Sequence, residues 1–259
     1  RVGFSDLIQD RDSIVRRHLL VQASDEYCPT IDAFSLVIAR RYLEAEGKVY
    51  KAPFSTEGYY LQPLQFSNTL FQGLSAFAGG YQGQSDADVT YQTLLNYRLV
   101  NGNPSEFAPR VRLRQVLDNQ ISETDIKDRI ILIGITAKIS ADDYFFTPYG
   151  EMVGVVIQAQ MASQIISTVL DGRALMWWLP RWGDWLWIGV WSWIAGGMVW
   201  QFQRPLYIVV AGGLSCCILY GIVYIIFVNV NGWIPLIPAG LNLVTTGVFV
   251  IYITAKFSH

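Results

Sequence analysis

Residues 205–228 read PLYIVVAGGLSCCILYGIVYIIFV, and no charged side chain interrupts them. Two similar uncharged stretches flank this one, at residues 185–203 and 233–255. Each is about 20 residues long, which is enough for a helix to cross the roughly 30 Å hydrocarbon core of a bilayer. A surface helix of a soluble protein normally keeps a charged, hydrated face, and these stretches have none. The sequence therefore predicts a membrane protein with three transmembrane helices in this part of the chain.

The charged residues are concentrated in the rest of the chain. After Asp184 the only charged side chains are those of Arg204 and Lys256. Removing these three residues from the totals of 19 basic and 21 acidic residues leaves a net charge of −3 before Asp184. A negative globular segment does not favour nucleic acid as a partner. We therefore predict a globular domain at residues 1–176, long enough for a core of its own, and a membrane segment at residues 177–259.

The orientation in the membrane follows from tryptophans and basic residues. Indole rings favour the headgroup level of a bilayer, and five tryptophans crowd the entrance to the first stretch: Trp177, Trp178, Trp182, Trp185 and Trp187. Arg204 and Lys256 follow the first and third stretches, and basic residues favour the cytoplasmic side. We therefore expect residues 1–176 outside the plasma membrane and the C-terminus inside the cell. The three stretches contain no ionisable carboxylate, amine or guanidinium, which argues against an ion or proton transporter.

The ends of the chain and its cysteines give weaker information. Residues 1–4 read RVGF, which is typical of a strand interior, so we expect the sequence to be a piece of a longer protein. Cys28 has no second cysteine near it in the globular part, and the two other cysteines lie within residues 205–228. The cysteines and histidines show no spacing typical of a metal site, so no metal and no cofactor is predicted.

Patterns typical of strands and helices alternate along the globular part. Strands are predicted at residues 2–4, 14–21, 93–99 and 130–134, helices at residues 31–46 and 153–170, and a short helix or a turn at residues 111–117. Thr30 or Asp32 is expected to cap the first long helix, and Gly47 to end it. Gly172 is expected to end the last of these helices.

The most informative unit begins at Ile130–Gly134, a wholly apolar run that suits a central strand covered on both faces. A polar loop and a helix follow, as in an α/β unit, where ligands bind beyond the carboxyl end of the strand. We therefore predict ligand contacts at Thr136, Asp142, Asp143 and Thr147, with an ordinary loop as the alternative. Adjacent carboxylates alone do not predict catalysis, because no nucleophile–base pair accompanies them.

A second candidate site lies near the start of the chain. Asp10 and Asp12 could bind a cation, but a calcium loop needs more oxygen ligands and a closing glutamate, so a solvated turn is the alternative. Arg16 and Arg17 alternate across a predicted strand, so only one is expected to face inward. Arg16 could bind an anion, and an ion pair with one of the aspartates is the alternative.

A third candidate lies in the predicted strand at residues 93–99. Asn96 and Arg98 share one face of that strand, and Tyr97 lies on the other. Asn96 and Arg98 are therefore candidate ligand contacts. The alternative is that Arg98 is buried with an acidic partner.

The order of these motifs resembles the C-terminal half of CHASE2 domains, which are extracytoplasmic sensor modules of bacteria and are common in cyanobacteria. The resemblance rests on Lys127–Gly134, Thr136-Ala137, Asp142–Pro148 and Gly154-Val155, and on Val2–Phe4, Asp10-x-Asp12, Arg16-Arg17 and Leu95–Arg98. Three membrane helices directly after the domain are also usual in that family. The chain departs from the family at Ser13, where glycine is usual, and at Gln158, where histidine is frequent.

The resemblance implies a receptor: an α/β extracytoplasmic sensor domain, not itself an enzyme, whose three transmembrane helices relay an unknown small-molecule or physical signal. It also implies an output domain elsewhere, of the kinase, cyclase or caspase-like CHAT type, and an anchor and first part of the domain before residue 1. The alternative is a membrane anchor or interaction module that senses nothing. The bilayer is the expected partner, with a homodimer possible in either case.

Overall fold

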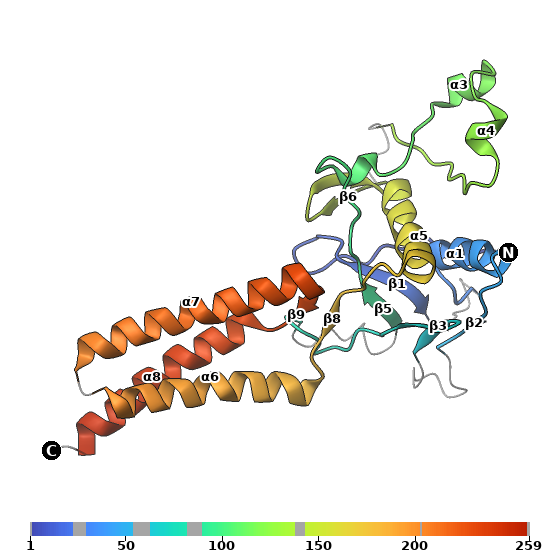
Figure 1. Cartoon of the computed structure of the whole chain (residues 1–259). Helices are drawn as coiled ribbons and strands as arrows, with labels where there is room; N and C mark the ends of the chain where they lie inside the picture. The colour runs from blue at the N-terminus through green and yellow to red at the C-terminus, as the bar shows by residue number, and fades with distance from the viewer. Residues whose placement is uncertain are drawn as a thin grey trace. The chain divides into compact units, whose positions relative to one another are not determined.

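The computed structural model of the chain describes residues 2–22, 30–53, 63–81, 90–137, 143–202 and 204–257. Two compact units are formed (Figure 1). The first consists of Arg1–Leu74 and Asp86–Leu175, and the second of Ser75–Ser85 and Met176–His259. The first unit is mixed α/β and the second is mainly helical, which confirms the predicted fold class at this level.

The first unit contains short strands and helices in alternation. In chain order they are β1 (Arg17–Gln22), α1 (Phe34–Ala45), β2 (Tyr50–Lys51), β3 (Leu64–Phe66), β4 (Thr69–Phe71), β5 (Thr90–Leu94), the 3-10 turn η1 (Pro104–Glu106), α3 (Leu113–Leu117), α4 (Glu123–Ile126), β6 (Tyr144–Thr147), β7 (Gly150–Val153) and α5 (Gly154–Asp171). The described strand pairs of this unit are antiparallel: β1 with β5, β2 with β3, β3 with β4, and β6 with β7.

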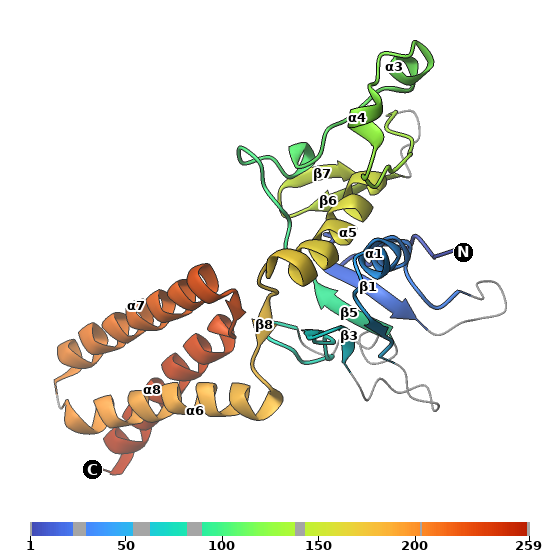
Figure 2. The same cartoon turned by 45° about the vertical axis from the view of Figure 1, so that its right-hand side comes forward.

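The core of the first unit lies between the β1–β5 pair and the helices α1 and α5, which lie side by side (Figure 2). Leu20 of β1, Leu36 of α1 and Ile165 of α5 are at most 1% exposed and belong to one apolar cluster. Each such side chain contributes about 1.5–3 kcal/mol through removal from water. The register of β1 on β5 shifts between Leu19 and Val21, so the pair contains a bulge.

Two predicted strands are shorter in the structure. Residues 2–4 form only one bridge, between Phe4 and Ala33, because the segment before α1 takes both the donor and the acceptor of Phe4. The predicted strand at residues 14–21 begins at Arg17. Ile14 makes a single bridge to Phe146 of the β6–β7 hairpin instead.

The helix ends follow the predicted glycines but not the predicted caps. Gly47 and Gly172 have positive φ angles of 73° and 67° directly after α1 and α5, as predicted. The N-cap of α1 is Ala33, without a side-chain hydrogen bond, so the prediction of Thr30 or Asp32 is wrong. The Asp32 carboxylate instead accepts a 2.7 Å hydrogen bond from Arg40 Nη1, in the second turn of the helix.

The predicted central strand at Ile130–Gly134 is also wrong. This run is coil, and Ile131, Ile133 and Ile135 are 55%, 94% and 67% exposed. An apolar run becomes a strand only where a neighbouring strand supplies hydrogen-bond partners. Within the described residues, no backbone–backbone hydrogen bond involves residues 130–135, and the helices α3 and α4 that precede the run stand away from α1 and α5 in Figures 1 and 2.

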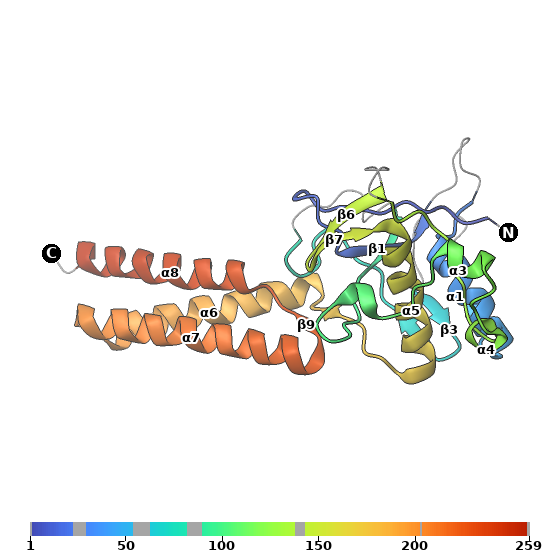
Figure 3. The ribbon, with the colours of Figure 1, turned by 90° about the horizontal axis from the view of Figure 1, so that it is seen from above.

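The second unit is a helical hairpin extended by one helix. Its elements are β8 (Trp177–Trp178), α6 (Arg181–Gln201), α7 (Pro205–Val230), β9 (Gly232–Trp233) and α8 (Leu236–Phe257). The three helices run side by side (Figure 3) and enclose a cluster that includes Trp191, Ala195, Leu219, Ala239 and Leu243. The two alanines of this cluster, Ala195 and Ala239, allow close helix packing, as in membrane bundles.

Two of these helices are long and apolar enough to cross a membrane, Leu206–Val230 and Leu236–Thr254. Asn242 of α8 donates a hydrogen bond to the Ser192 hydroxyl of α6, which satisfies both groups inside the bundle. The outward faces are apolar and exposed, with Trp193 84% and Trp200 88% exposed. Exposed apolar area on this scale indicates a surface that contacts lipid or protein rather than water.

A small collar closes one end of the bundle. β8 pairs with β9 in parallel, and the Trp177 indole N–H donates to the carbonyl of Val230 at 2.8 Å. The segment Ser75–Tyr81, which is distant in sequence, belongs to this unit. Its Tyr81 ring meets the Trp233 ring edge-on, with centroids 5.0 Å apart, and the Arg181 guanidinium lies 4.9 Å from the centre of the Phe77 ring.

The buried ring of His18, in β1, is expected to lower the stability of the protein in mild acid. The ring is fully buried, its Nε2 lies 2.8 Å from the Ser35 hydroxyl, and burial lowers its pKa from 6.5 to about 3. Because the unfolded state binds the proton more readily, the free energy of unfolding is highest above pH 6.5 and falls between pH 6.5 and pH 3. We expect a loss of about 2 kcal/mol between pH 8 and pH 5, measured by chemical unfolding of the full chain. The His18→Gln variant should lose this dependence, and an unchanged slope in that variant would contradict the assignment.

Candidate functional site

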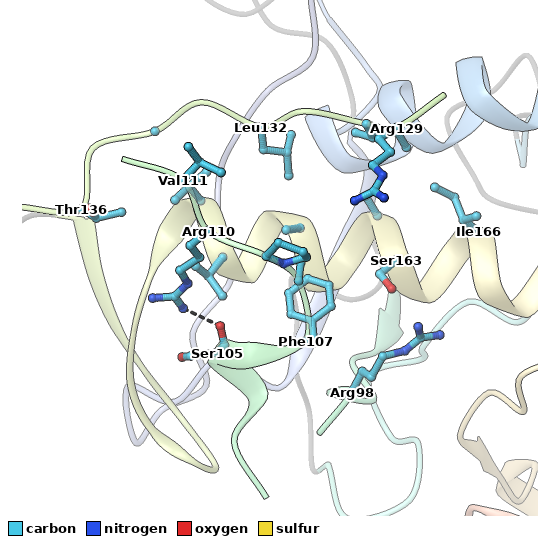
Figure 4. A pocket seen from close by; sticks show the side chains of 18 of the residues that line it. Arg98, Ser105, Phe107, Arg110, Val111, Arg129, Leu132, Thr136, Ser163 and Ile166 are labelled. Carbon is cyan, nitrogen blue, oxygen red and sulfur yellow. Dashed lines mark hydrogen bonds between the residues drawn. The ribbon is translucent and has the colours of Figure 1, made fainter. Parts of the chain in front are cut away.

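A cavity of about 1030 Å³ lies in the first unit, between helix α5 and the segment that runs from η1 to Thr136. Figure 4 shows this cavity with the side chains that line it. One part of the lining is apolar and comes from both walls: Phe107, Val111, Leu132, Val155 and Ile166. The volume is within the range of sites that hold small organic ligands.

Two glutamines of α5 fix the strand end that carries Arg98. The amide of Gln160 accepts from the backbone N–H of Arg98 at 2.9 Å and donates to the carbonyls of Arg98 and Pro104 at 2.9 and 2.6 Å. The amide of Gln164 accepts from the N–H of Asn96 at 2.9 Å and donates to the carbonyl of Leu94 at 3.0 Å. The helix thereby replaces a neighbouring strand, which explains why residues 95–98 stay extended although β5 ends at Leu94.

The opposite wall rests on α5 at one close contact. A Cβ atom added to Gly134 would lie 2.6 Å from the Cβ atom of Val155, so only glycine fits here without displacing that side chain. The hydroxyl of Tyr144 donates to the carbonyl of Thr136 at 3.0 Å and fixes the end of the same segment. These contacts hold the exposed apolar run beside the helix.

The polar part of the lining is rich in arginine. Four arginines and two aspartates line the cavity: Arg98, Arg110, Arg112, Arg129, Asp128 and Asp171. Figure 4 shows the side chains of Arg98 and Arg129 on either side of Ser163 of α5. Arg110 lies farther along the cavity, where its Nη2 donates to the carbonyl of Ser105 at 2.6 Å. No ion pair joins any of these four arginines to a carboxylate within the described ranges.

A fifth arginine adds positive charge near Arg98. Burial lowers the pKa of Arg173, and the charge of Arg98 lowers it further. The Nη2 of Arg173 donates to the carbonyl of Asn96 at 2.8 Å, whereas its Nη1 is buried without a hydrogen-bond partner in the part of the chain that the structure describes. Two guanidinium groups that repel each other and lack carboxylate partners create a local positive potential.

The predicted site near the start of the chain forms an ion-pair cluster instead of an open site. Arg16 contacts Asp10 at 3.0 Å and Asp12 at 2.8 Å, and Arg17 contacts Asp10 at 2.7 Å. The hydrogen bond from Arg16 lowers the pKa of Asp12, and the same contact raises the pKa of Arg16. The alternative of an internal ion pair is therefore confirmed, and it involves both arginines.

The predicted loop residues separate into three places. Thr136 lines the cavity, whereas Asp142 lies outside the described residues. Thr147 holds the β6–β7 turn, because its hydroxyl donates to the carbonyl of Gly150 at 2.8 Å and accepts from the N–H of Tyr149 at 3.2 Å. The carboxylate of Asp143 lies against Gly154, the first residue of α5, where a negative charge favours the helix N-terminus.

Asn96 and Arg98, the third predicted site, have different roles in the structure. Arg98 lines the cavity, and its predicted alternative of an acidic partner is not met by any described carboxylate. Asn96 contributes its backbone N–H and carbonyl to Gln164 and Arg173. Tyr97 is buried on the opposite side and donates to the carbonyl of Val15 at 2.9 Å, as the alternation predicted.

The predicted site residues did not include Phe107, Arg110, Arg129 or Ser163, which line the cavity. The alternating arginines of the stretch RVRLR, residues 110–114, were an available signal. Gln160 and Gln164 were another, because two buried amides four residues apart on an apolar helix require partners.

Comparison with protein families matches residues 1–197 to the model of the CHASE2 domain. The matched region includes all residues of the cavity and extends into α6. No curated protein and no solved structure matches the chain.

Proposed function

The chain belongs to the CHASE2 family of extracytoplasmic sensor domains, and from this we propose that it is the membrane-anchored sensory module of a signal-transduction protein, with a ligand cavity in its first unit. The family match over residues 1–197 carries the proposal. CHASE2 domains are sensory and not catalytic, so the module detects a signal and any enzymatic output belongs to another domain.

The apolar helices support a membrane location. α7 and α8 meet the length and composition of membrane spans. We propose α6 as a third span, because its 21 residues reach about 30 Å and its Trp191 and Ala195 pack in the same cluster as α7 and α8. Arg204 and Lys256 then mark the cytoplasmic side, and residues 1–176 are extracytoplasmic.

The cavity supports a chemical rather than a purely mechanical signal. It combines an apolar wall with convergent polar groups, which is the usual composition of a small-molecule site. Binding would fix the segment 105–136, whose outer residues are exposed, against α5. A ligand that prefers one arrangement of this wall can shift a two-state equilibrium by its difference in affinity.

The proposal is tested on the full chain in nanodiscs of phosphatidylcholine. The native cysteines are replaced by serine, and spin labels are placed at Gln201 and Lys256, near the ends of α6 and α8. We expect that a compound which protects amides of residues 105–136 from hydrogen exchange also changes the distance between the labels. A ligand that protects these amides without any change in that distance would contradict a relay through the helices.

The exposed apolar run favours a second candidate, a module that holds a protein partner or a second copy of the chain. Ile131, Ile133 and Ile135 present an apolar surface on the first unit. In this case Ile133→Cys should form a disulfide-linked dimer in membranes, and no compound should alter the label distance. The absence of any such crosslink would weigh against self-association at this surface.

A further inference from the structure

The arrangement of charge in the cavity indicates the chemical class of the ligand. Arg98 and Arg129 line the cavity on either side of Ser163 and come from two separate segments of the chain (Figure 4). Each presents a guanidinium without a carboxylate partner in the described part of the chain, and Ser163 adds a hydroxyl. Guanidinium groups on the wall of one cavity are suited to carboxylate or phosphate oxygens.

The backbone makes this arrangement rigid on one side. Gln160 holds both the N–H and the carbonyl of Arg98, so the Cα atom of Arg98 is fixed to α5. Fixing the backbone before binding lowers the entropy lost on complex formation. Arg173, whose Nη2 binds the carbonyl of Asn96, adds a further positive charge near Arg98.

The negative charge at the carboxyl end of α5 does not neutralise the arginines of the cavity. A helix C-terminus carries about half a negative charge, and Asp171 lies there as the last residue of α5. The cavity is lined by four arginines and by the two aspartates Asp128 and Asp171. Positive charge therefore remains in excess when the cavity is empty.

The apolar part of the cavity wall indicates the chemistry of the rest of the ligand. Phe107, Leu132 and Ile166 offer apolar surface next to the arginines, and the cavity volume exceeds what a bare inorganic anion fills. We propose, resting on the sensor function above, that the cavity binds an amphiphilic organic anion. Its carboxylate or phosphate is held by Arg98, Arg129 and Ser163, and its apolar body lies against the wall.

The test uses octanoate as the probe, with octanol as the uncharged control and acetate as the control without an apolar body. Titration calorimetry on the full chain in phosphatidylcholine nanodiscs should show binding of octanoate and much weaker binding of both controls. Arg98→Gln and Arg129→Gln should each weaken octanoate about 10- to 100-fold. Arg114→Gln, which removes the same charge from a side chain 91% exposed and outside the cavity, should leave the affinity unchanged.

A free anion and a lipid headgroup share this chemistry, and a second arm separates them. If phosphatidylglycerol in the nanodisc displaces octanoate from the wild type and from Arg114→Gln, the headgroup binds the same site and the lipid is the natural source. If octanoate binds equally well with and without phosphatidylglycerol, a soluble amphiphile is the natural source. In both cases the loss of octanoate affinity in Arg98→Gln supports the anion site.

A structural role for Arg98 gives a different result. Removing one of two repelling cations should raise the melting temperature of the ligand-free protein in Arg98→Gln. A lower melting temperature with unchanged octanoate affinity would overturn the proposal, as would equal binding of octanol and octanoate or no binding of octanoate. In those cases the sensor function still stands if another compound changes the label distance.

Discussion

Replacing Gln160 by leucine is expected to lower the free energy of unfolding by about 3–5 kcal/mol. The Gln160 side chain is fully buried and makes three hydrogen bonds to the backbone of Arg98 and Pro104. Leucine has a similar size, so the packing changes little, but the buried N–H of Arg98 and two carbonyls lose their partners. Each unsatisfied group costs about 1–3 kcal/mol, and chemical unfolding of the full chain measures the sum.

Gln158→Leu is the matched control, because it changes the same side chain on the same helix. Gln158 is also buried but makes one bond, a 3.0 Å donation to the carbonyl of Ser5, and its Oε1 has no partner among the described residues. We expect a loss below about 1 kcal/mol. Equal losses in the two variants would show that the strand end does not depend on the Gln160 amide.

Arg17→Met is expected to lower the free energy of unfolding by about 3–5 kcal/mol. The Arg17 side chain is 2% exposed, and its three nitrogens bind Asp10 at 2.7 Å, Gln92 at 2.8 Å and the carbonyl of Gln9 at 3.1 Å. Methionine removes all of these contacts, so the carboxylate of Asp10, which is 8% exposed, loses one of its two arginine partners, and Gln92 and the carbonyl of Gln9 lose theirs. Removing one member of a buried polar cluster is costly because the remaining groups stay desolvated.

Arg16→Met provides the comparison for this second variant. Arg16 binds the same Asp10 and also Asp12, but it is 37% exposed, so water screens both pairs. We expect a loss of less than about 1 kcal/mol for Arg16→Met in the same unfolding assay. If Arg16→Met costs as much as Arg17→Met, the distinction between a buried and a surface ion pair does not hold here.

Local signals were sufficient for the C-terminal ends of α1 and α5. Gly47 and Gly172 end α1 and α5 because a left-handed residue after a helix is a property of a few neighbouring positions. The apolar stretches at the other end were equally readable, since their length and composition alone satisfy the requirement of a bilayer. These predictions needed no knowledge of distant contacts.

Non-local pairing explains what the sequence did not reveal. The run at Ile130–Gly134 has strand composition, but hydrogen-bond partners must come from elsewhere in the chain, and composition does not show whether they do. The extension at residues 95–98 is the converse case, because its partners are glutamines of a helix that begins more than 50 residues later. The alternation of side chains along a strand does not predict that a helix, instead of a second strand, supplies these partners.

The site shows the same limit. Thr136 and Arg98 were identified as candidates and both line the cavity, whereas Asp10, Asp12 and Arg16 satisfy one another. Arg129 can be recognised as a candidate site residue only in the folded structure, where it lies near Ser163 and Arg98 (Figure 4). A cluster assembled from separate segments is a property of the folded chain.

The chain passes between its two units at three places, after Leu74, before Asp86 and after Leu175. Two of these crossings flank the segment whose Tyr81 meets Trp233 at the α7–α8 turn, and the third leads into α6. The second unit is therefore assembled from two pieces of the chain that are far apart in sequence. Closing its collar carries the entropy cost of a long loop, because the intervening residues belong to the first unit.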